Sequence, residues 1–429
     1  MKILLINKFY HDNGKSGGVG RHILELEKIL TRNDHEVIPF ATKQKEAKKN
    51  NYLEYFPRYF DLGKVKFNSE SLKNISKIFY NSEAAEKLES LIKKTKPDIA
   101  HIHNIYHHLS PSILTALKKH NIPIVMTVHD YKLICPNYLL FSKGKICQKC
   151  QGGKYYNCLK NKCVKNSYAA SLVLMLEAYW AKHKKYYEKN IDCFIAPSLF
   201  MRDILIKNGY DSRKIKYVPN FLDFLPTGQA GRLRKNDIKG GNNAGDEKYF
   251  LFFGRLSQEK GIDILIKSLP LVNLKKYKLK IAGSGQEENK LKELAKNLKL
   301  ENKIKFVGYQ SGKGLKNLVS EAKFIIIPSV WHENAPYSIL ESYNAEKAVI
   351  GSRIGGIPEM IRENKTGLIF NAGDKKKIAE KINYLITHPK KAIQMGMAGK
   401  KYLNKKFNQK KYYNKLVKIY RELREENFS

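Results

Sequence analysis

Short runs of apolar residues alternate along the chain with longer segments in which apolar residues recur every three or four positions. The short runs predict strands and the longer segments amphipathic helices, so repeated strand, helix, strand units with parallel sheets are expected. Two series of strands follow. The first comprises Ile3–Ile6, Ile99–His103, Ile124–Val128, Cys193–Ala196 and Ile215–Val218; the second comprises Tyr249–Phe253, Leu279–Ala282, Ile304–Val307, Phe324–Ile327, Ala348–Ile350 and Leu368–Phe370.

The two series predict two α/β domains, each a doubly wound parallel sheet. Residues 227–248 are rich in Gly, Asn and Lys and poor in apolar side chains, which is typical of a linker or surface loop. We therefore expect domains at 1–222 and 249–405, a linker or loop at 223–248, and a last helix at 406–429. That helix carries an apolar stripe of Tyr412, Leu416, Ile419, Tyr420 and Leu423.

The 429 residues include 79 Lys and Arg against 40 Asp and Glu, a net charge of +39. This excess favours an acidic partner, although the lysines are scattered in the way that a general compositional bias would scatter them. No apolar segment approaches the ~20 residues that span a bilayer, and no signal-peptide layout is visible, so a cytoplasmic location is expected. The longest apolar stretch, Ser171–Leu176 within Tyr168–Trp180, is interpreted as a core helix in preference to a membrane-surface helix.

Glycines and cations follow several predicted strands. Gly17-Gly18-Val19-Gly20 precedes a helix after the first strand, and a ligand or a simple tight turn would each explain these glycines. Gly254-Arg255 and Lys260-Gly261 follow the first strand of the second series, at the edge where doubly wound sheets bind ligands. Two cations there suit a diphosphate, which they can neutralise as a divalent metal would. The alternative is an exposed loop with two ordinary cations.

Gly283-Ser284-Gly285 is a second turn that permits close backbone approach. Glu333-Asn334-Ala335 follows the strand Phe324–Ile327, with Asn334 expected to cap a helix that carries Glu341. Two helical turns would bring Glu333 and Glu341 to one side of the helix start, about 10 to 12 Å apart. One carboxylate could then bind sugar hydroxyls and the other a ribose, whereas a solvated helix with two surface glutamates is the structural alternative.

Together these motifs and Gly355-Gly356-Ile357-Pro358-Glu359 resemble the family-four retaining glycosyltransferases of GT-B fold, over nearly the whole chain. The resemblance implies two Rossmann-like domains facing a cleft, with acceptors bound mainly by the N-terminal domain and the last helix returning to it. It implies that Arg255 and Lys260 bind the donor diphosphate, that Glu333 contacts the donor sugar and that Glu341 holds the ribose. Further donor-binding positions that we infer are Gly18, Gly254, Gly283, Ser284, Gly285, Asn334 and Ala335. The chain departs from the family in having Asn334-Ala335-Pro336 in place of a Gly-Phe-Gly sequence, and Phe221 in place of a glycine common after Val218-Pro219-Asn220.

The family often has a histidine near the donor sugar at the position of His129, which we take as a catalytic residue; His103, also at a strand end, is a weaker candidate. The implied function is metal-independent transfer of a sugar from a UDP- or GDP-sugar to a lipid-linked or saccharide acceptor, in surface polysaccharide or glycolipid synthesis. No Asp-x-Asp pair occurs in the chain, which argues against the metal-binding aspartates of the other large glycosyltransferase fold. The positive charge predicts a peripheral position on the inner face of the plasma membrane.

Four cysteines lie in an insertion at about 135–167: Cys147, Cys150, Cys158 and Cys163. The first pair has the spacing of a structural zinc site and the second pair could complete four thiolates, while plain reduced thiols explain the residues equally well and an iron–sulfur cluster less well. The charge and the cysteines leave a zinc-containing nucleic-acid binder as an alternative, but no RNA-binding motif is visible and no nucleic-acid partner is expected. A GT-B epimerase or phosphorylase is a further alternative with the same fold.

Overall fold

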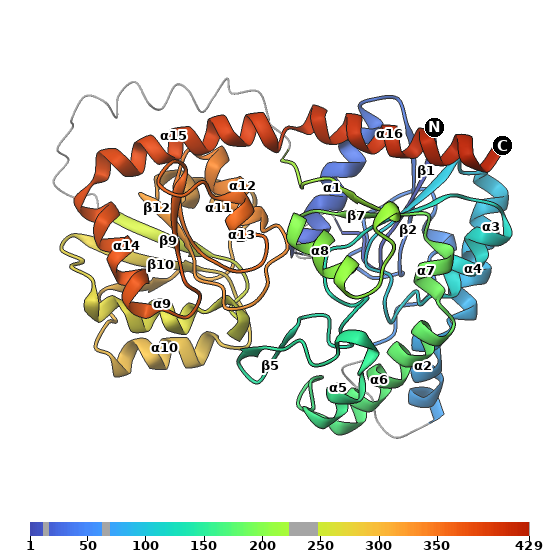
Figure 1. Ribbon diagram of the computed structural model, residues 1–429, viewed down its shortest axis with the longest axis horizontal. Coiled ribbons are helices and arrows are strands. Elements are labelled where there is room, and N and C mark those ends of the chain that lie inside the picture. Colours follow the sequence, from blue (N-terminus) through green and yellow to red (C-terminus); the bar gives the residue numbers. More distant parts are fainter. Residues whose placement is uncertain (12–16, 62–68, 223–247, 429) are drawn as a thin grey trace. The chain divides into compact units, whose positions relative to one another are not determined.

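The computed structural model describes residues 1–11, 17–61, 69–222 and 248–428. The chain divides into two compact units, each described here by itself (Figure 1). Unit 1 comprises Met1–Asn220 and Tyr412–Ser429, and unit 2 comprises Phe221–Lys411. The predicted linker at 223–248 lies, except for Lys248, outside the described residues.

Unit 1 contains a six-stranded parallel sheet in the order β2-β1-β3-β4-β7-β8. Its strands are β1 (Lys2–Ile6), β2 (Glu36–Phe40), β3 (Ile99–Ile102), β4 (Ile124–Thr127), β7 (Cys193–Ala196) and β8 (Ile215–Tyr217). Its helices are α1 (Gly17–Thr31), α2 (Ser69–Phe79), α3 (Ser82–Thr95), α4 (Ser112–Lys119), α5 (Tyr156–Lys160), α6 (Tyr168–His183), α7 (Tyr186–Asn190), α8 (Leu199–Lys207) and most of α16 (Gln409–Phe428). A two-stranded hairpin, β5 (Phe141–Ser142) with β6 (Lys145–Ile146), opens the cysteine-rich insertion.

Unit 2 has a second six-stranded parallel sheet, in the order β11-β10-β9-β12-β13-β14. Its strands are β9 (Lys248–Phe253), β10 (Tyr277–Ala282), β11 (Ile304–Phe306), β12 (Phe324–Ile327), β13 (Ala348–Ser352) and β14 (Gly367–Phe370). Its helices are α9 (Ile262–Ser268), α10 (Glu288–Asn297), α11 (Gly312–Glu321), α12 (Tyr337–Asn344), α13 (Ile357–Met360), α14 (Lys375–Thr387) and α15 (Pro389–Lys406). The predicted fold class of two doubly wound parallel-sheet domains is confirmed.

The sheet of unit 2 is buried on both faces because successive side chains of each strand enter different cores. Phe250 and Phe252 of β9 pack with α9, α10 and α14, whereas Leu251 and Phe253 pack with α12 and α13 on the other face. This explains why the strand sequences are continuous apolar runs without polar alternation. The stacked rings of Phe250 and Phe324, with centroids 5.2 Å apart, join neighbouring strands in the first of these cores.

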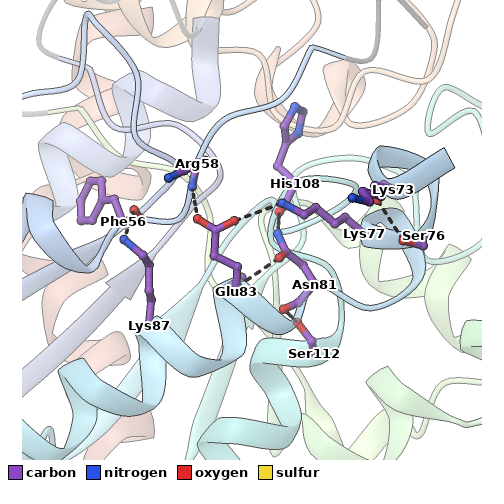
Figure 2. Close-up of polar contacts among 11 residues, drawn as sticks. Phe56, Arg58, Lys73, Ser76, Lys77, Asn81, Glu83, Lys87, His108 and Ser112 are labelled. Carbon is purple, nitrogen blue, oxygen red and sulfur yellow. Dashed lines mark hydrogen bonds and ion pairs between the residues drawn. The ribbon is translucent and has the colours of Figure 1, made fainter. Parts of the chain in front are cut away.

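The start of α3 shows how local polar groups fix the packing of unit 1 (Figure 2). Asn81 caps the helix by accepting from the amide of Ala84, and its own side chain donates to the carbonyl of His108 at 2.7 Å. The carboxylate of Glu83, in the first turn, accepts from the amide of Arg58 at 2.9 Å and pairs with Lys77 at 3.1 Å. These bonds connect α3 to the end of α2 and to the loop after β3, close to the carboxyl edge of the sheet.

Candidate functional site

The strand order of unit 2 reverses between β9 and β12, and ligands of doubly wound sheets bind at the carboxyl ends of the strands beside this point. Gly254 and Arg255 follow β9 directly, and the segment that ends in Glu333 follows β12. The predicted diphosphate-binding and sugar-binding residues therefore come from the two loops that flank the topological switch point. The amide of Val330 donates to the carbonyl of Glu259 at 3.0 Å, which joins these two loops.

The loops after β9 and β10 interlock through glycines. A Cβ on Gly283 would lie 1.8 Å from the carbonyl oxygen of Gly254, and one on Gly285 would lie 2.2 Å from that of Leu256. The amide of Leu256 also donates to the carbonyl of Ser284 at 2.9 Å. These glycines were predicted as places of close approach to a ligand, and in the structure the close approach is between two backbone segments. They allow the loop after β10 to pack directly against the backbone on either side of Arg255.

Arg255 is oriented by a carboxylate of its own loop. One terminal nitrogen of its guanidinium donates to Glu259 Oε1 at 2.7 Å, and the hydroxyl of Ser257 donates to the same oxygen at 2.7 Å. Glu259 is buried, whereas the side chain of Arg255 keeps 60% of its surface exposed. The guanidinium is therefore fixed at one end and has further N–H groups available for an anionic ligand.

Lys260 and Glu333 form the central ion pair of unit 2. The ammonium nitrogen of Lys260 lies 2.6 Å from Glu333 Oε1, and the hydroxyl of Ser329 donates to the same oxygen at 2.7 Å. Burial by itself would raise the pKa of Glu333, but the charge of Lys260 and these two hydrogen bonds hold the pKa below its ordinary value. Glu333 is therefore ionised at neutral pH, and it accepts hydrogen bonds without donating any.

The backbone of Glu333 is clamped by the glycine turn after β13. Gly356 donates its amide to the carbonyl of Glu333 at 2.7 Å. Gly355 has φ of +56°, and a Cβ there would lie 2.2 Å from the same carbonyl oxygen. Only glycine fits this position, because both the backbone conformation and the space exclude a side chain. The motif Gly355-Gly356 thus positions the carboxylate of Glu333.

The helix after Glu333 begins later than predicted. Asn334 was expected to cap it, but α12 begins at Tyr337 with Pro336 as its N-cap, and no side chain caps it. Proline has no amide to satisfy and a fixed φ, which suits this position. Asn334 is buried and Ala335 packs against the core, so both lie in the non-helical connection. The assumption that about two helical turns separate Glu333 from Glu341 is therefore wrong; half-buried Glu341 lies in the second turn of α12.

In unit 1, four histidines gather at the carboxyl edge of the sheet. His22 comes from α1, His101 and His103 from β3 and the residue after it, and His129 from the loop after β4. Nδ1 of His103 lies 2.9 Å from Nε2 of His129, and the ring centroids of His22 and His129 are 5.0 Å apart. Gly18 is exposed in the first turn of α1, and residues 12–16, which precede that helix, lie outside the described residues.

This histidine cluster, made by His22, His101, His103 and His129, is uncharged at neutral pH. Burial lowers the pKa of His22 and of His101 to about 3, and it lowers the pKa of His103 and His129 well below the usual range. Within the described part of the chain, His22, His103 and His129 are the one set of three or more His, Cys, Asp or Glu whose ligand atoms all lie within 4.8 Å of one another. Neutral imidazoles can bind a transition metal, and they can equally donate to and accept from a sugar.

Two tyrosines of α16 complete the histidine cluster. The hydroxyl of Tyr412 lies 3.2 Å from Nε2 of His22, and that of Tyr420 lies 2.6 Å from Nδ1 of His101. Sequence reasoning missed both His22 and His101. A signal existed for His101, because residues two apart on a strand share a face and His103 was already a candidate. No sequence signal pointed to Ser329 or Glu259, the partners of the predicted charged residues.

The cysteines of the insertion lie close together but not as a preformed metal site. Cys147 and Cys150 follow the hairpin, Cys158 lies in α5 and Cys163 follows that helix. Cys150, Cys158 and Cys163 share one small apolar cluster. A hydrogen bond with Cys158 lowers the pKa of Cys163 to about 6 and raises the pKa of Cys158.

The two doubly wound sheets, with paired charges at the switch point of one and histidines at the edge of the other, define a two-domain fold of the GT-B class. Two family models match the chain: "Glycosyltransferase Family 4" over residues 16–224 and "Glycosyl transferases group 1" over residues 234–402. The two matches together cover most of the chain. The chain belongs to this glycosyltransferase family, as its motifs predicted.

The chain also resembles curated relatives in sequence and a solved structure in fold. The chain is 27% identical to an uncharacterized 42.6 kDa protein in the cps region of Klebsiella pneumoniae, over 84% of this chain and 88% of that one. It is 26% identical to the amylovoran biosynthesis glycosyltransferase AmsK of Erwinia amylovora, over 40% of this chain and 44% of AmsK. Anabaena Alr3699/HepE in complex with UDP and glucose shares the fold, with a TM-score of 0.65, 18% identity and coverage of 98% and 99% of the two chains.

None of the helices among the described residues is both long and apolar enough to cross a bilayer.

Proposed function

We propose that the protein is a retaining, metal-independent hexosyltransferase. It moves a sugar from a UDP- or GDP-sugar to a lipid-linked or saccharide acceptor in the synthesis of a surface polysaccharide or glycolipid. The amylovoran enzyme among its relatives supports the polysaccharide, and the UDP complex of a protein with the same fold supports the nucleotide donor.

The observation that carries the proposal is the Lys260–Glu333 ion pair at the switch point of unit 2, with Arg255 in the adjoining loop. Lys260 has three N–H donors and gives one to Glu333, so the others can bind the donor diphosphate. Glu333 stays ionised and offers its carboxylate oxygens to the hydroxyls of the donor sugar. Glu341 is assigned to the ribose, as the family resemblance implies.

In the proposed reaction, the acceptor hydroxyl oxygen forms a bond to the anomeric carbon while the bond from that carbon to the phosphate oxygen breaks. The acceptor attacks from the face that the diphosphate leaves, and its proton passes to the departing phosphate oxygen. Negative charge grows on the diphosphate as the bond breaks. Arg255 and Lys260 stabilise that charge more in the transition state than in the bound donor, which lowers the barrier.

In this proposal, His129 is uncharged and forms a hydrogen bond with the donor sugar. Its pKa lies well below the usual range, so the ring carries no charge at neutral pH. His103 bonds to His129 at 2.9 Å and fixes the orientation of its ring. Gly18, at the start of α1, would leave helix amides open to an anionic group of either substrate.

A donor-binding assay tests this function directly. UDP or GDP should raise the temperature of unfolding, and Glu341→Ala should abolish that protection while Glu293→Ala, on exposed α10, should keep it. Donor hydrolysis and transfer should then be measured with the nucleotide sugars of whichever base protects. Failure of every nucleotide to stabilise the protein would refute the assignment of donor.

Two alternatives are separated by the same assay. A GT-B epimerase or phosphorylase would also bind a nucleotide or phosphate, but it would give no transfer to an acceptor. The nucleic-acid binder has lost its support, because family membership accounts for the glycines, glutamates and cations that it left unused. Equal turnover after treatment with EDTA would support the proposed independence from a divalent metal.

We also propose a structural zinc ion on Cys147, Cys150, Cys158 and Cys163. The hairpin and α5 are short, and the small apolar cluster of this region has four buried members, two of which are cysteines. An insertion with so small an apolar core needs a cross-link, such as a bound metal ion, to be stable. Metal analysis of the purified protein should find zinc, which Cys147→Ser with Cys150→Ser should remove. A protein without zinc and with four titratable thiols would refute this proposal.

A further inference from the structure

Helix α6 exposes an apolar face. Tyr168, Leu172, Leu176 and Tyr179 have 58%, 40%, 46% and 37% of their surface exposed. Their spacing of four, four and three residues places all of them on one side of the helix. The sequence interpretation of this segment as a core helix is therefore wrong for this side. Exposed apolar residues in a continuous row are unusual for a surface helix and mark a surface that binds something.

The other side of α6 supplies the packing that holds the helix in unit 1. Ser171, Leu174 and Ala178 are buried there. Glu177, the one acidic residue of α6, is also buried and pairs with Lys132. The exposed side of α6 therefore carries no negative charge.

Helix α5 extends the apolar face of α6, against which it packs (Figure 1). Tyr156 is exposed on α5, and its backbone amide donates to the hydroxyl of Tyr179 at 3.2 Å. We call this patch the α5–α6 surface; it is made by Tyr156, Tyr168, Leu172, Leu176 and Tyr179. Tyrosines have an apolar ring and a polar hydroxyl, which suits a boundary between water and an apolar phase.

Lysines surround the α5–α6 surface. Residues 143–176 contain seven lysines and no aspartate or glutamate. The ammonium nitrogen of Lys162 lies 4.2 Å from the ring centroid of Tyr168, and that of Lys160 lies 5.0 Å from the ring centroid of Tyr156. Lys182 is exposed in the last turn of α6. Cations therefore lie beside the apolar row on both helices.

We infer that the α5–α6 surface docks the protein on an anionic lipid bilayer. Leucine side chains enter the boundary between headgroups and acyl chains, tyrosines lie at headgroup depth, and lysines bind the lipid phosphates. Nucleic acid would use the lysines and leave Leu172 and Leu176 in water. The inference deepens the proposed function and rests on it only for the choice of the inner membrane face, where a lipid-linked acceptor would be within reach.

Sedimentation with vesicles tests this docking without donor or acceptor, so it can fail while the nucleotide assay succeeds. The full chain should sediment with vesicles of phosphatidylcholine mixed with phosphatidylglycerol and not with phosphatidylcholine alone. Leu172→Ser with Leu176→Ser should lower the partition coefficient about tenfold or more. The matched control is Ile393→Ser with Met397→Ser, an exposed apolar pair of the same spacing on α15, which should bind as the wild type does.

Charge is tested in the same way. Lys160→Glu with Lys162→Glu should weaken vesicle binding more than Lys296→Glu with Lys299→Glu, which changes the net charge equally on α10 and the residue just after its C-cap. Circular dichroism and unfolding temperature should show that all four variants are folded. The inference is overturned by no vesicle binding, by equal binding to neutral vesicles, or by equal losses in the α6 variant and its control. A wild-type dimer that the leucine substitutions convert to monomer, without a change in vesicle binding, would assign the surface to a second copy of the chain.

Discussion

The carboxyl edges of the two sheets differ in charge: one carries ionised side chains and the other carries neutral histidines. In unit 2 the edge carries two ion pairs, Arg255 with Glu259 and Lys260 with Glu333. In unit 1 the same edge carries four histidines whose pKa values burial has lowered, so that they are neutral at pH 7. In the proposed reaction the first edge binds the charged diphosphate of the donor and the second binds uncharged sugar hydroxyls.

The difference shows that topology alone does not decide what a strand-end site binds. Both sheets are doubly wound and bring loop residues to a switch point. In unit 2 each buried carboxylate has a cation and a hydroxyl donor as partners, and the hydroxyl comes from Ser257 or Ser329. For Glu333 these partners hold the pKa below its ordinary value despite burial. In unit 1 burial lowers the pKa values of the imidazoles instead, so the rings lose their protons and are neutral at pH 7.

The largest effect is expected from removing the charge of the unit 2 edge. Arg255→Ala with Lys260→Ala should lower turnover about 10⁴-fold, since one lost stabilising donor costs about 10²- to 10³-fold. Steady-state transfer with the accepted donor measures this. Lys296→Ala with Lys299→Ala removes the same charge from a remote surface and should leave turnover unchanged. Intact turnover in the first variant would show that the ion pairs are structural only.

Most of the fold was predictable because burial on both faces gives parallel strands continuous apolar runs. Each of the eleven predicted strands is present, with ends that differ by at most two residues. β2 was missed because its apolar run is only Val37 to Phe40, interrupted by Pro39. Proline removes a backbone donor and is atypical of a strand, but β2 lies at the edge of the sheet, where proline is tolerated.

The site was predictable only in part, because its partners are far apart in the chain. Lys260 and Glu333 were each identified, but their contact across 73 positions follows from the strand order. The contact of His22 with Tyr412 spans 390 positions, and no local pattern encodes it. The apolar segment of α6 was assigned to the core because hydropathy does not reveal which side of a helix remains uncovered.

The next largest effect is expected at Gly355, which positions the charged edge through the backbone. Gly355→Ala should destabilise unit 2 by about 4 kcal/mol and reduce turnover, because strain in the left-handed region adds to a clash with the carbonyl of Glu333. Gly373→Ala is the control: its φ is +85° and a Cβ there meets nothing within 4 Å, so strain alone should cost about 1 kcal/mol. Calorimetry measures both. Equal losses of stability in the two variants would contradict the proposed role of Gly355 in positioning Glu333.

A smaller effect is expected from a substitution that removes the charge of Glu333 but keeps the size of its side chain. Glu333→Gln should lower turnover about 10²-fold, whereas Glu293→Gln on exposed α10 should not. The lowered pKa of Glu333 stabilises the folded chain fully above the ordinary value of 4.5, and this contribution is lost as the pH falls through the folded pKa. The stability difference between wild type and Glu333→Gln should therefore shrink on acidification below pH 4.5. A constant difference would mean that the carboxylate gains nothing from Lys260.

The smallest effect is expected from the neutral histidines of unit 1, which make the stability of the fold depend on pH. Burial lowers the pKa of His101 in the folded chain to about 3 from its ordinary value of 6.5, so the unfolded chain takes up a proton below pH 6.5 that the folded chain does not. Stability is therefore full above pH 6.5 and falls by about 1.4 kcal/mol per pH unit below it for this residue. His101→Gln should reduce the slope of unfolding free energy between pH 6 and 5 by that amount. An unchanged slope would mean that His101 titrates normally.

Because α16 belongs to unit 1, the two parts of this unit are synthesised at different times. The sheet of unit 1 is encoded before residue 220, yet Tyr412 and Tyr420, which bond to its histidines, are translated about two hundred codons later. All of unit 2 is therefore synthesised while the sheet of unit 1 still lacks its contacts with α16. The contacts of α16 with that sheet can form only after unit 2 has been synthesised, and a premature stop codon before α16 would prevent them.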